Sequence, residues 1–243
     1  MRSCVIIPAR FKSSRFKGKP LALIMGKPMI LWVTELSAVA VGKKNVFVAT
    51  DDNRIKHTLE AAGFNVIMTK PENLTGTDRV AEASTQLDYD IYINVQGDEP
   101  LANPKDILKA IEIKKNNMKY VINSFSYLND DDNPDSKNIP KVVTDENNNL
   151  IFISRSKVPS SKLESTNYKY KKQVCIYAYD QQQLDKFSSF GRKSIIEKQE
   201  DIEILRFFEL NIPVMMFESS TKTIAVDFPE DIKKVEKFMK NKC

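Results

Sequence analysis

Ser3-Cys4-Val5-Ile6-Ile7-Pro8 is a short apolar run near the amino terminus that ends in a proline. Such a run is typical of a strand buried in a parallel sheet. Similar runs predict strands at residues 45–50, 65–68, 90–95 and 120–127. Helical patterns separate them at 29–40, from Asp51 or Asp52 to Ala62, from Thr77 or Asp78, and from Asn103 to Asn116. This alternation predicts an α/β fold with a doubly wound, mixed and mostly parallel sheet.

The second half of the chain changes character after Asn129. Residues 141–144 and 150–154 flank a polar turn, as in a hairpin, and residues 156–172 read as a long, polar, mobile loop. Further strands are expected at 174–179 and 213–218, and helices at 200–210 and 229–240. No linker interrupts this series. We therefore predict one domain over residues 1–243, in which 128–243 is an extension built onto the sheet of 1–127.

Composition excludes several classes of protein. The 243 residues are 42% hydrophobic with a mean hydropathy of −0.38, and the apolar start is too short for a signal peptide, so we expect a cytoplasmic protein that does not enter a membrane. The net charge of +5 is spread along the chain without a basic tail, which disfavours nucleic acid as a partner. Such a charge suits a small anionic substrate.

The reactive residue types are few. Cys4, Cys175 and Cys243 are scattered without metal-ligand spacing and are interpreted as free thiols. His57 is the only histidine and lies in a polar helical pattern, which disfavours a hydrolase with a histidine-dependent triad. Glycine (7 residues) and arginine (8, against 29 lysines) are also scarce, so the places where they occur are informative.

The loop after the first strand, residues 8–21, contains Arg10, Ser13, Arg15, Gly18 and Lys19. Ligands of open α/β sheets bind at the carboxyl ends of strands, and this loop could hold a polyphosphate there through cations and backbone N–H groups. It is not a Walker A loop, and no Gly-x-Gly-x-x-Gly is present, which disfavours a dinucleotide-binding dehydrogenase. The alternative is an ordinary solvated basic loop.

Three more stretches could carry chemistry. Gln96-Gly97-Asp98-Glu99-Pro100 follows the strand at 90–95, where a carboxylate could hold Mg²⁺ between nucleotide phosphates, although such a sequence could also be a plain polar turn. Residues 75–79 and 225–231 could each be a simple helix cap. The loop at 8–21 and the stretches at 96–100 and 75–79 would converge on one edge of the sheet.

Taken together, these stretches resemble the cytidylyltransferases that make CMP-Kdo from CTP and 3-deoxy-manno-octulosonate (Kdo). The resemblance runs along nearly the whole chain. It is carried by residues 6–10, 26–29, 49–52, 96–100, 141–143, 154–155, 176–179, 203–206 and 226–227. It implies a nucleotide-diphospho-sugar transferase-like fold, with CTP bound by residues 1–127 and the acceptor by 128–243. It also implies Mg²⁺ as cofactor, a homodimer formed through the second half, and a product used for lipopolysaccharide or capsule.

The resemblance also implies site residues. The catalytic residues would be Arg10, Lys19, Asp98 and Asp227, of which Asp98 and Asp227 would hold the metal. The nucleotide would meet Pro8, Ala9, Arg10, Ser13, Lys19, Thr75, Gly76, Arg79, Gln96 and Asp98. The acceptor acid would meet Gln96, Arg155, Gln173, Tyr177, Glu203 and Ile204.

The chain departs from the family mainly on the acceptor side. Gln173 stands where the family has His, Cys175 where it has Gly, Ile204 where it has Gln, and Phe228 where it has Thr. Such changes alter substrate preference more than chemistry. The acceptor could therefore be Kdo, an amino derivative of Kdo, another hydroxy acid or a phosphonate. A nucleotide-binding protein without catalysis is a second hypothesis, against which the presence of both Asp98 and Asp227 argues.

Overall fold

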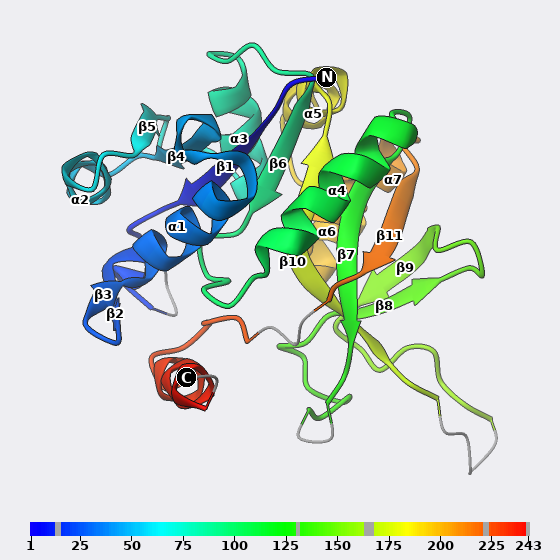
Figure 1. Ribbon diagram of the computed structural model, residues 1–243. Helices are drawn as coiled ribbons and strands as arrows, with labels where there is room; N and C mark the ends of the chain where they lie inside the picture. Colours follow the sequence, from blue (N-terminus) through cyan, green and yellow to red (C-terminus); the bar gives the residue numbers. More distant parts are fainter. Residues whose placement is uncertain (13–15, 130–131, 163–167, 221–223, 242–243) are drawn as a thin grey trace.

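The computed structural model describes residues 1–12, 16–129, 132–162, 168–220 and 224–241. Ser13, Arg15 and Cys243, discussed above, lie outside these ranges. The described residues form a nine-stranded sheet (Figure 1). Its main path runs β11 (Val214–Glu218), β7 (Val121–Tyr127), β10 (Lys171–Tyr179), β6 (Ile91–Val95), β1 (Ser3–Ala9), β4 (Val46–Thr50) and β5 (Asn65–Met68). The hairpin of β8 (Lys141–Thr144) and β9 (Leu150–Ser154) joins it through β10.

The sheet is mixed and mostly parallel, as predicted. β6, β1, β4 and β5 run parallel to one another, and so do β11 and β7. β10 is antiparallel to both of its neighbours on the main path, β6 and β7. Strands from the second half thus enter the middle and one edge of the sheet that the first half begins.

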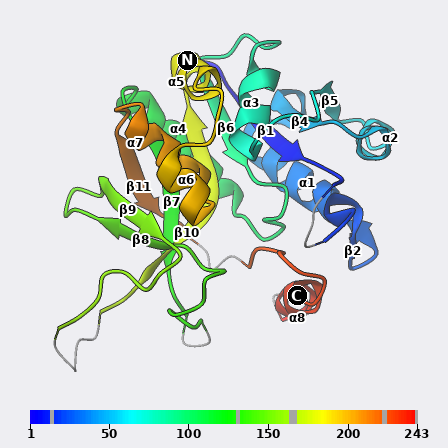
Figure 2. The same cartoon turned by 180° about the vertical axis from the view of Figure 1, so that it is seen from behind.

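Helices cover both faces of the sheet (Figures 1 and 2). Helices α1 (Met29–Val41), α2 (Asn53–Ala61) and α4 (Pro104–Asn116) pack on the face to which Val5 and Ile7 point. The opposite face, with Cys4 and Ile6, is covered by α3 (Gly76–Ser84), α5 (Gln181–Ser189) and α7 (Arg206–Glu209). Because successive side chains of β1 point to opposite faces and both faces are buried, its sequence is apolar from Cys4 to Ala9.

The predicted helix at 200–210 is wrong in its extent. Residues 195–209 instead form α6 (Ile195–Glu200), a 3₁₀ turn η3 (Glu203–Leu205) and α7. Asp201 adopts a left-handed conformation (φ 52°) that ends α6. Neither α5 nor α6 was anticipated, although each begins with a capping box, at Asp180 and Ser194 respectively. The third helix begins at Gly76, with Thr75 as its cap, and not at Thr77 or Asp78.

The chain ends in α8 (Asp231–Lys240), which lies apart from the sheet (Figure 1). Val226 and Val235 bury their side chains there against Ile24 and Met29. Ile24 belongs to the small hairpin of β2 (Leu23–Ile24) and β3 (Lys27–Pro28), which follows the 3₁₀ turn η1 (Lys19–Leu21). Elsewhere, a second 3₁₀ turn, η2 (Lys43–Asn45), precedes β4. This contact brings the segment before α8 to the loop after β1. Among the described residues, no helix is long and apolar enough to span a membrane.

Candidate active site

The loops that follow β1 and β6 meet at the carboxyl ends of these parallel strands. A Cβ added to Gly97 would lie 3.1 Å from the carbonyl oxygen of Pro8, so only glycine fits this approach without a shift of the backbone. On the other side, the backbone N–H of Gln96 donates to the carbonyl oxygen of Cys175 at 3.1 Å. The predicted convergence of these stretches on one edge of the sheet is confirmed.

Lys19, Asp98 and Asp227 come together at this edge from three distant segments. The ammonium of Lys19 donates to Oδ2 of Asp98 at 2.7 Å and to the carbonyl oxygen of Val226 at 2.9 Å. The backbone N–H of Val226 in turn donates to the carbonyl oxygen of Asp98 at 3.0 Å. Asp227 therefore directly follows Val226, whose backbone is hydrogen-bonded to both Lys19 and Asp98. All three side chains keep partial access to solvent, as a ligand site requires.

Two carboxylates at this place fit Mg²⁺. The described residues contain no group of three or more His, Cys, Asp or Glu side chains able to hold a metal. Magnesium usually binds one or two protein carboxylates and takes its remaining oxygens from water and substrate phosphates. The pair Asp98 and Asp227 would hold such an ion only in part, leaving room for a nucleotide.

Arg10 and Arg79 provide positive charge beside this centre. Arg10, directly after β1, is exposed, whereas Arg79 on α3 is buried, where it donates to Thr69 and lies 3.5 Å from Asp51. Burial lowers the pKa of Arg79, and the charge of Arg10 lowers it further against the opposing effect of Asp51. Arg10 is thus open to solvent at this edge of the sheet, whereas Arg79 is held inside the fold by Thr69 and Asp51.

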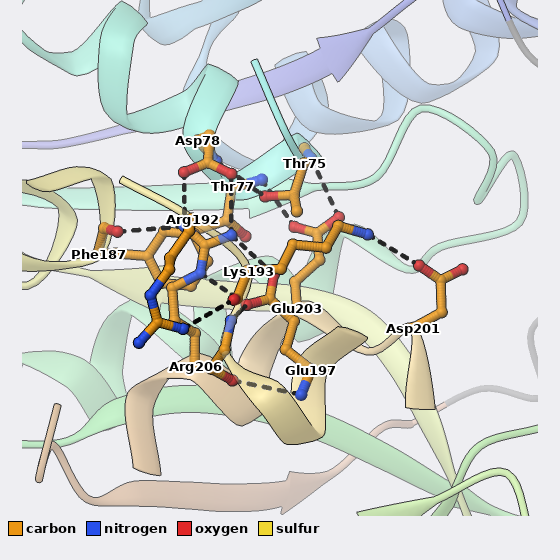
Figure 3. A network of polar contacts seen from close by, with 12 residues as sticks. Thr75, Thr77, Asp78, Phe187, Arg192, Lys193, Glu197, Asp201, Glu203 and Arg206 are labelled. Carbon is orange, nitrogen blue, oxygen red and sulfur yellow. Dashed lines mark hydrogen bonds and ion pairs between the residues drawn. The ribbon is translucent and has the colours of Figure 1, made fainter. Parts of the chain in front are cut away.

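The carboxylate of Glu203, the first residue of η3, lies at the amino-terminal end of α3 (Figure 3). Its carboxylate accepts from the backbone N–H groups of Gly76 at 3.1 Å and of Thr77 at 2.7 Å. A Cβ on Gly76 would lie 2.9 Å from Nε2 of Gln96 and 3.3 Å from Oε1 of Glu203. Burial raises the pKa of Glu203, although the bonds from Thr77 and Gly76 oppose this. The turn at Gly76 thus places Gln96 and Glu203 side by side.

Arg206 is fully buried below this turn and was not identified as a site residue from the sequence (Figure 3). Its guanidinium donates to both carboxylate oxygens of Asp78, at 2.7 and 3.1 Å, and to both of Glu197, at 2.8 and 2.7 Å. It also lies over the ring of Phe187. Burial acts to lower the pKa of Arg206, but the hydrogen bonds that it donates to Glu197 and Asp78 outweigh this effect and raise the pKa. Arg206 thereby ties α3 to α6 and α7.

The acceptor residues predicted on β10 lie beside Glu203. Nε2 of Gln173 donates to the hydroxyl of Tyr177 at 3.2 Å and to Oδ1 of Asn123 on β7 at 3.0 Å. Burial raises the pKa of Tyr177 well above its usual value, and the charge of Glu203 adds to this effect. Tyr177 thus links Gln173 to Glu203, which lies beside Gln96 at Gly76. Asn123 is the member of this group that sequence reasoning did not find.

Arg155 and Ile204, which were also predicted to meet the acceptor, lie away from this group of polar side chains. Three backbone carbonyl oxygens, those of Lys137, Glu200 and Asp201, accept from the guanidinium of Arg155. Ile204 is buried in the apolar cluster beneath the sheet. In this structure both side chains support the second half of the chain, and neither is among the polar groups around Gln96.

The family model for cytidylyltransferases matches residues 4–237. A protein of Shewanella baltica named 8-amino-3,8-dideoxy-manno-octulosonate cytidylyltransferase is 39% identical over 97% of this chain and 98% of its own length. A protein of the same name from Shewanella frigidimarina is 36% identical over the same shares.

Among solved structures, CMP:2-keto-3-deoxy-manno-octonic acid synthetase complexed with CTP superposes with a TM-score of 0.91 at 33% identity, covering 100% of both chains. The inositol-1-phosphate CTP transferase of T. maritima shares the fold at a TM-score of 0.71 and 16% identity, over 99% of this chain and 95% of its own.

Proposed function

The chain belongs to the cytidylyltransferase family, and we propose that it transfers CMP from CTP to the anomeric hydroxyl of a sugar acid of the 3-deoxy-octulosonate type. The observation that carries this proposal is the match over nearly the full length of the chain to relatives and to a CTP complex with this activity. These comparisons support a CTP-dependent nucleotidyltransferase over a non-catalytic nucleotide-binding protein.

The reaction is one displacement at the α-phosphorus of CTP. The anomeric oxygen forms a bond to this phosphorus, the bond to the bridging oxygen of pyrophosphate breaks, and the hydroxyl proton is released. Negative charge grows on the pyrophosphate, so catalysis needs positioning and cations more than covalent help. Arg10 and Lys19, at the carboxyl end of β1, are suited to this role.

Asp98 and Asp227 would hold Mg²⁺, which supplies positive charge to the phosphates when it is bound. Lys19 keeps Asp98 in place for this role through the 2.7 Å ion pair. Chelation of divalent cations should abolish turnover, and Mg²⁺ should restore it. Asp98→Asn and Asp227→Asn should each lower kcat by roughly a hundredfold or more, whereas Asp88→Asn, a change at an exposed carboxylate, should not.

For the acceptor we propose 8-amino-3,8-dideoxy-manno-octulosonate, the acid in the names of the relatives at 36–39% identity. Kdo itself, another hydroxy acid and a phosphonate are the alternatives. The departures at Gln173 and Cys175 lie on this side of the site and support an altered acceptor.

The test is pyrophosphate release with CTP and a panel of these acids. We expect the highest kcat/KM with the 8-amino acid. A higher value with Kdo would overturn this choice of acceptor, and no release with either sugar acid would overturn the proposed function.

The organisation of the enzyme in solution is a further proposal. We propose a single domain over residues 1–243, a homodimer formed through residues 128–243, and a cytoplasmic location. Light scattering after size exclusion should give about twice the 27.8 kDa of the chain. A mass of one chain would contradict the homodimer.

A further inference from the structure

The side-chain amide of Asn123 has only one possible orientation. This residue lies fully buried on β7, beside the irregularity of β10 between Val174 and Tyr177. Its Nδ2 lies 3.0 Å from the carbonyl oxygens of both Val174 and Ile176. Because carbonyl oxygens only accept hydrogen bonds, the amide nitrogen must face them. The oxygen Oδ1 of Asn123 therefore points away from these two carbonyl groups and toward Gln173.

The orientation of Asn123 determines that of Gln173. Oδ1 of Asn123 can only accept, so the atom of Gln173 that lies 3.0 Å from it must be Nε2. The same nitrogen donates to the hydroxyl of Tyr177 at 3.2 Å, which uses its second hydrogen. Among the described residues, none donates a hydrogen bond to Oε1 of Gln173, and the side chain is only half-buried. Oε1 of Gln173 is thus available to accept a hydrogen bond from a ligand, whereas both N–H groups of its amide are already used.

The charged side chains near Gln173 favour a positively charged ligand group. The backbone N–H of Cys175, two residues along β10, lies 3.5 Å from Oε1 of Glu99, and burial raises the pKa of the Cys175 thiol with a further contribution from the carboxylate of Glu99. Negative potential of this kind attracts an ammonium and gives no advantage to a neutral hydroxyl.

We propose that Oε1 of Gln173, oriented by Asn123, accepts a hydrogen bond from the ammonium group of an amino sugar acid and selects it over the corresponding hydroxy acid. This inference rests on the proposed function and names the residue that decides its acceptor. An ammonium can only donate, so it matches a fixed acceptor, and its bond is about twice as strong as that of a hydroxyl. Gln173 is then the specificity-determining residue and Asn123 a positioning residue.

The experiment compares kcat/KM for 8-amino-3,8-dideoxy-manno-octulosonate and for Kdo in the wild type and in variants of Gln173. Gln173→Leu should lower the ratio of the two values by about tenfold, the loss of about 1.4 kcal/mol of discrimination. Gln173→Glu keeps an acceptor atom and should retain or raise the ratio. Gln182→Leu, the same change at an exposed position of α5, is the matched control and should leave the ratio unchanged.

Two further variants keep the test decisive if Gln173→Leu does not fold. Gln173→His offers a ring N–H donor of similar size and should shift the ratio toward Kdo. Asn123→Ala frees the amide of Gln173 to turn and should lower the ratio with Gln173 still present. Ratios that stay within about twofold of the wild type in all folded variants would overturn the inference, given the roughly tenfold worth of one such bond. A wild type inactive with both acids would instead overturn the proposed function, and this inference with it.

Discussion

The ammonium nitrogen of Lys19 lies 2.7 Å from Oδ2 of Asp98, which joins the loop after β1 to the loop after β6. Both side chains remain partly exposed, 16% and 27% respectively. Ion pairs with this degree of solvent access contribute only about 0–1 kcal/mol to folding. The pair is therefore better explained by the nucleotide and metal site that we propose than by the stability of the fold.

Lys19→Met tests this relationship. Loss of the ammonium removes positive charge from the phosphates and frees the Asp98 carboxylate, so kcat/KM for CTP should fall by roughly a hundredfold. The free energy of unfolding in urea should change by less than about 1 kcal/mol. Lys17→Met, at an exposed position of the same loop, is the control and should behave as the wild type. A large loss of stability without loss of activity would contradict this role.

Gly76→Ala should separate activity from stability. Gly76 is the first residue of α3, where alanine favours the helix by roughly 0.5–1 kcal/mol. The new methyl group would nevertheless lie 2.9 Å from Nε2 of Gln96 and must displace that side chain. We expect an unchanged or slightly higher midpoint of thermal unfolding and a higher KM for the acceptor acid. Wild-type kinetics in a folded variant would show that Gln96 has no part in acceptor binding.

Arg206→Ala should destabilise the protein strongly. The substitution leaves Asp78 and Glu197 buried without the cation that pairs with both, a situation that costs about 3–5 kcal/mol. Urea denaturation followed by circular dichroism measures this loss. Arg192→Ala, on the exposed surface nearby, should change the free energy of unfolding by no more than about 0.5 kcal/mol. Equal effects of the two substitutions would refute the structural role of Arg206.

Glu203 should make stability depend on pH in a defined direction. Burial raises its pKa in the folded protein, so the folded state holds this proton at pH values where the unfolded chain has lost it. Its contribution is fully present below the unfolded pKa and declines as the pH rises through the folded pKa. Glu203→Gln removes this titration. The free energy of unfolding of the variant, relative to the wild type, should therefore increase as the pH rises above the ordinary pKa of a glutamate side chain.

The control for this titration is Glu146→Gln, at an exposed turn between β8 and β9. Its free energy of unfolding should follow that of the wild type over the same pH range. A difference between Glu203→Gln and the wild type that stays constant, or that decreases with pH, would contradict the raised pKa of Glu203.

The local sequence determined the first half of the fold and the core of the candidate site. The strands β1, β4, β5, β6 and β7 were readable because each is a short apolar run, and the helices between them because their apolar residues recur with helical spacing. The two-residue strands β2 and β3 were not predicted. The site edge followed from the rule that loops after parallel strands converge. The helices α5 and α6 were missed because their signals are capping residues, Asp180 and Ser194, and not long periodic runs.

The tertiary structure alone decided which distant residues became partners. Val226, the residue before Asp227, meets the backbone of Asp98 because Val226 and Val235 bury their side chains against Ile24 and Met29. The role of Asn123 depends on an irregularity in β10, which carries no signal in the sequence of β7. Local pattern reflects which face of an element is buried, whereas a hydrogen bond between residues fifty or more positions apart, such as Gln173 to Asn123, exists only after the strands have paired. For this reason the convergence of the loops after β1 and β6 could be anticipated from the sequence, while the orientation of the Gln173 amide could not.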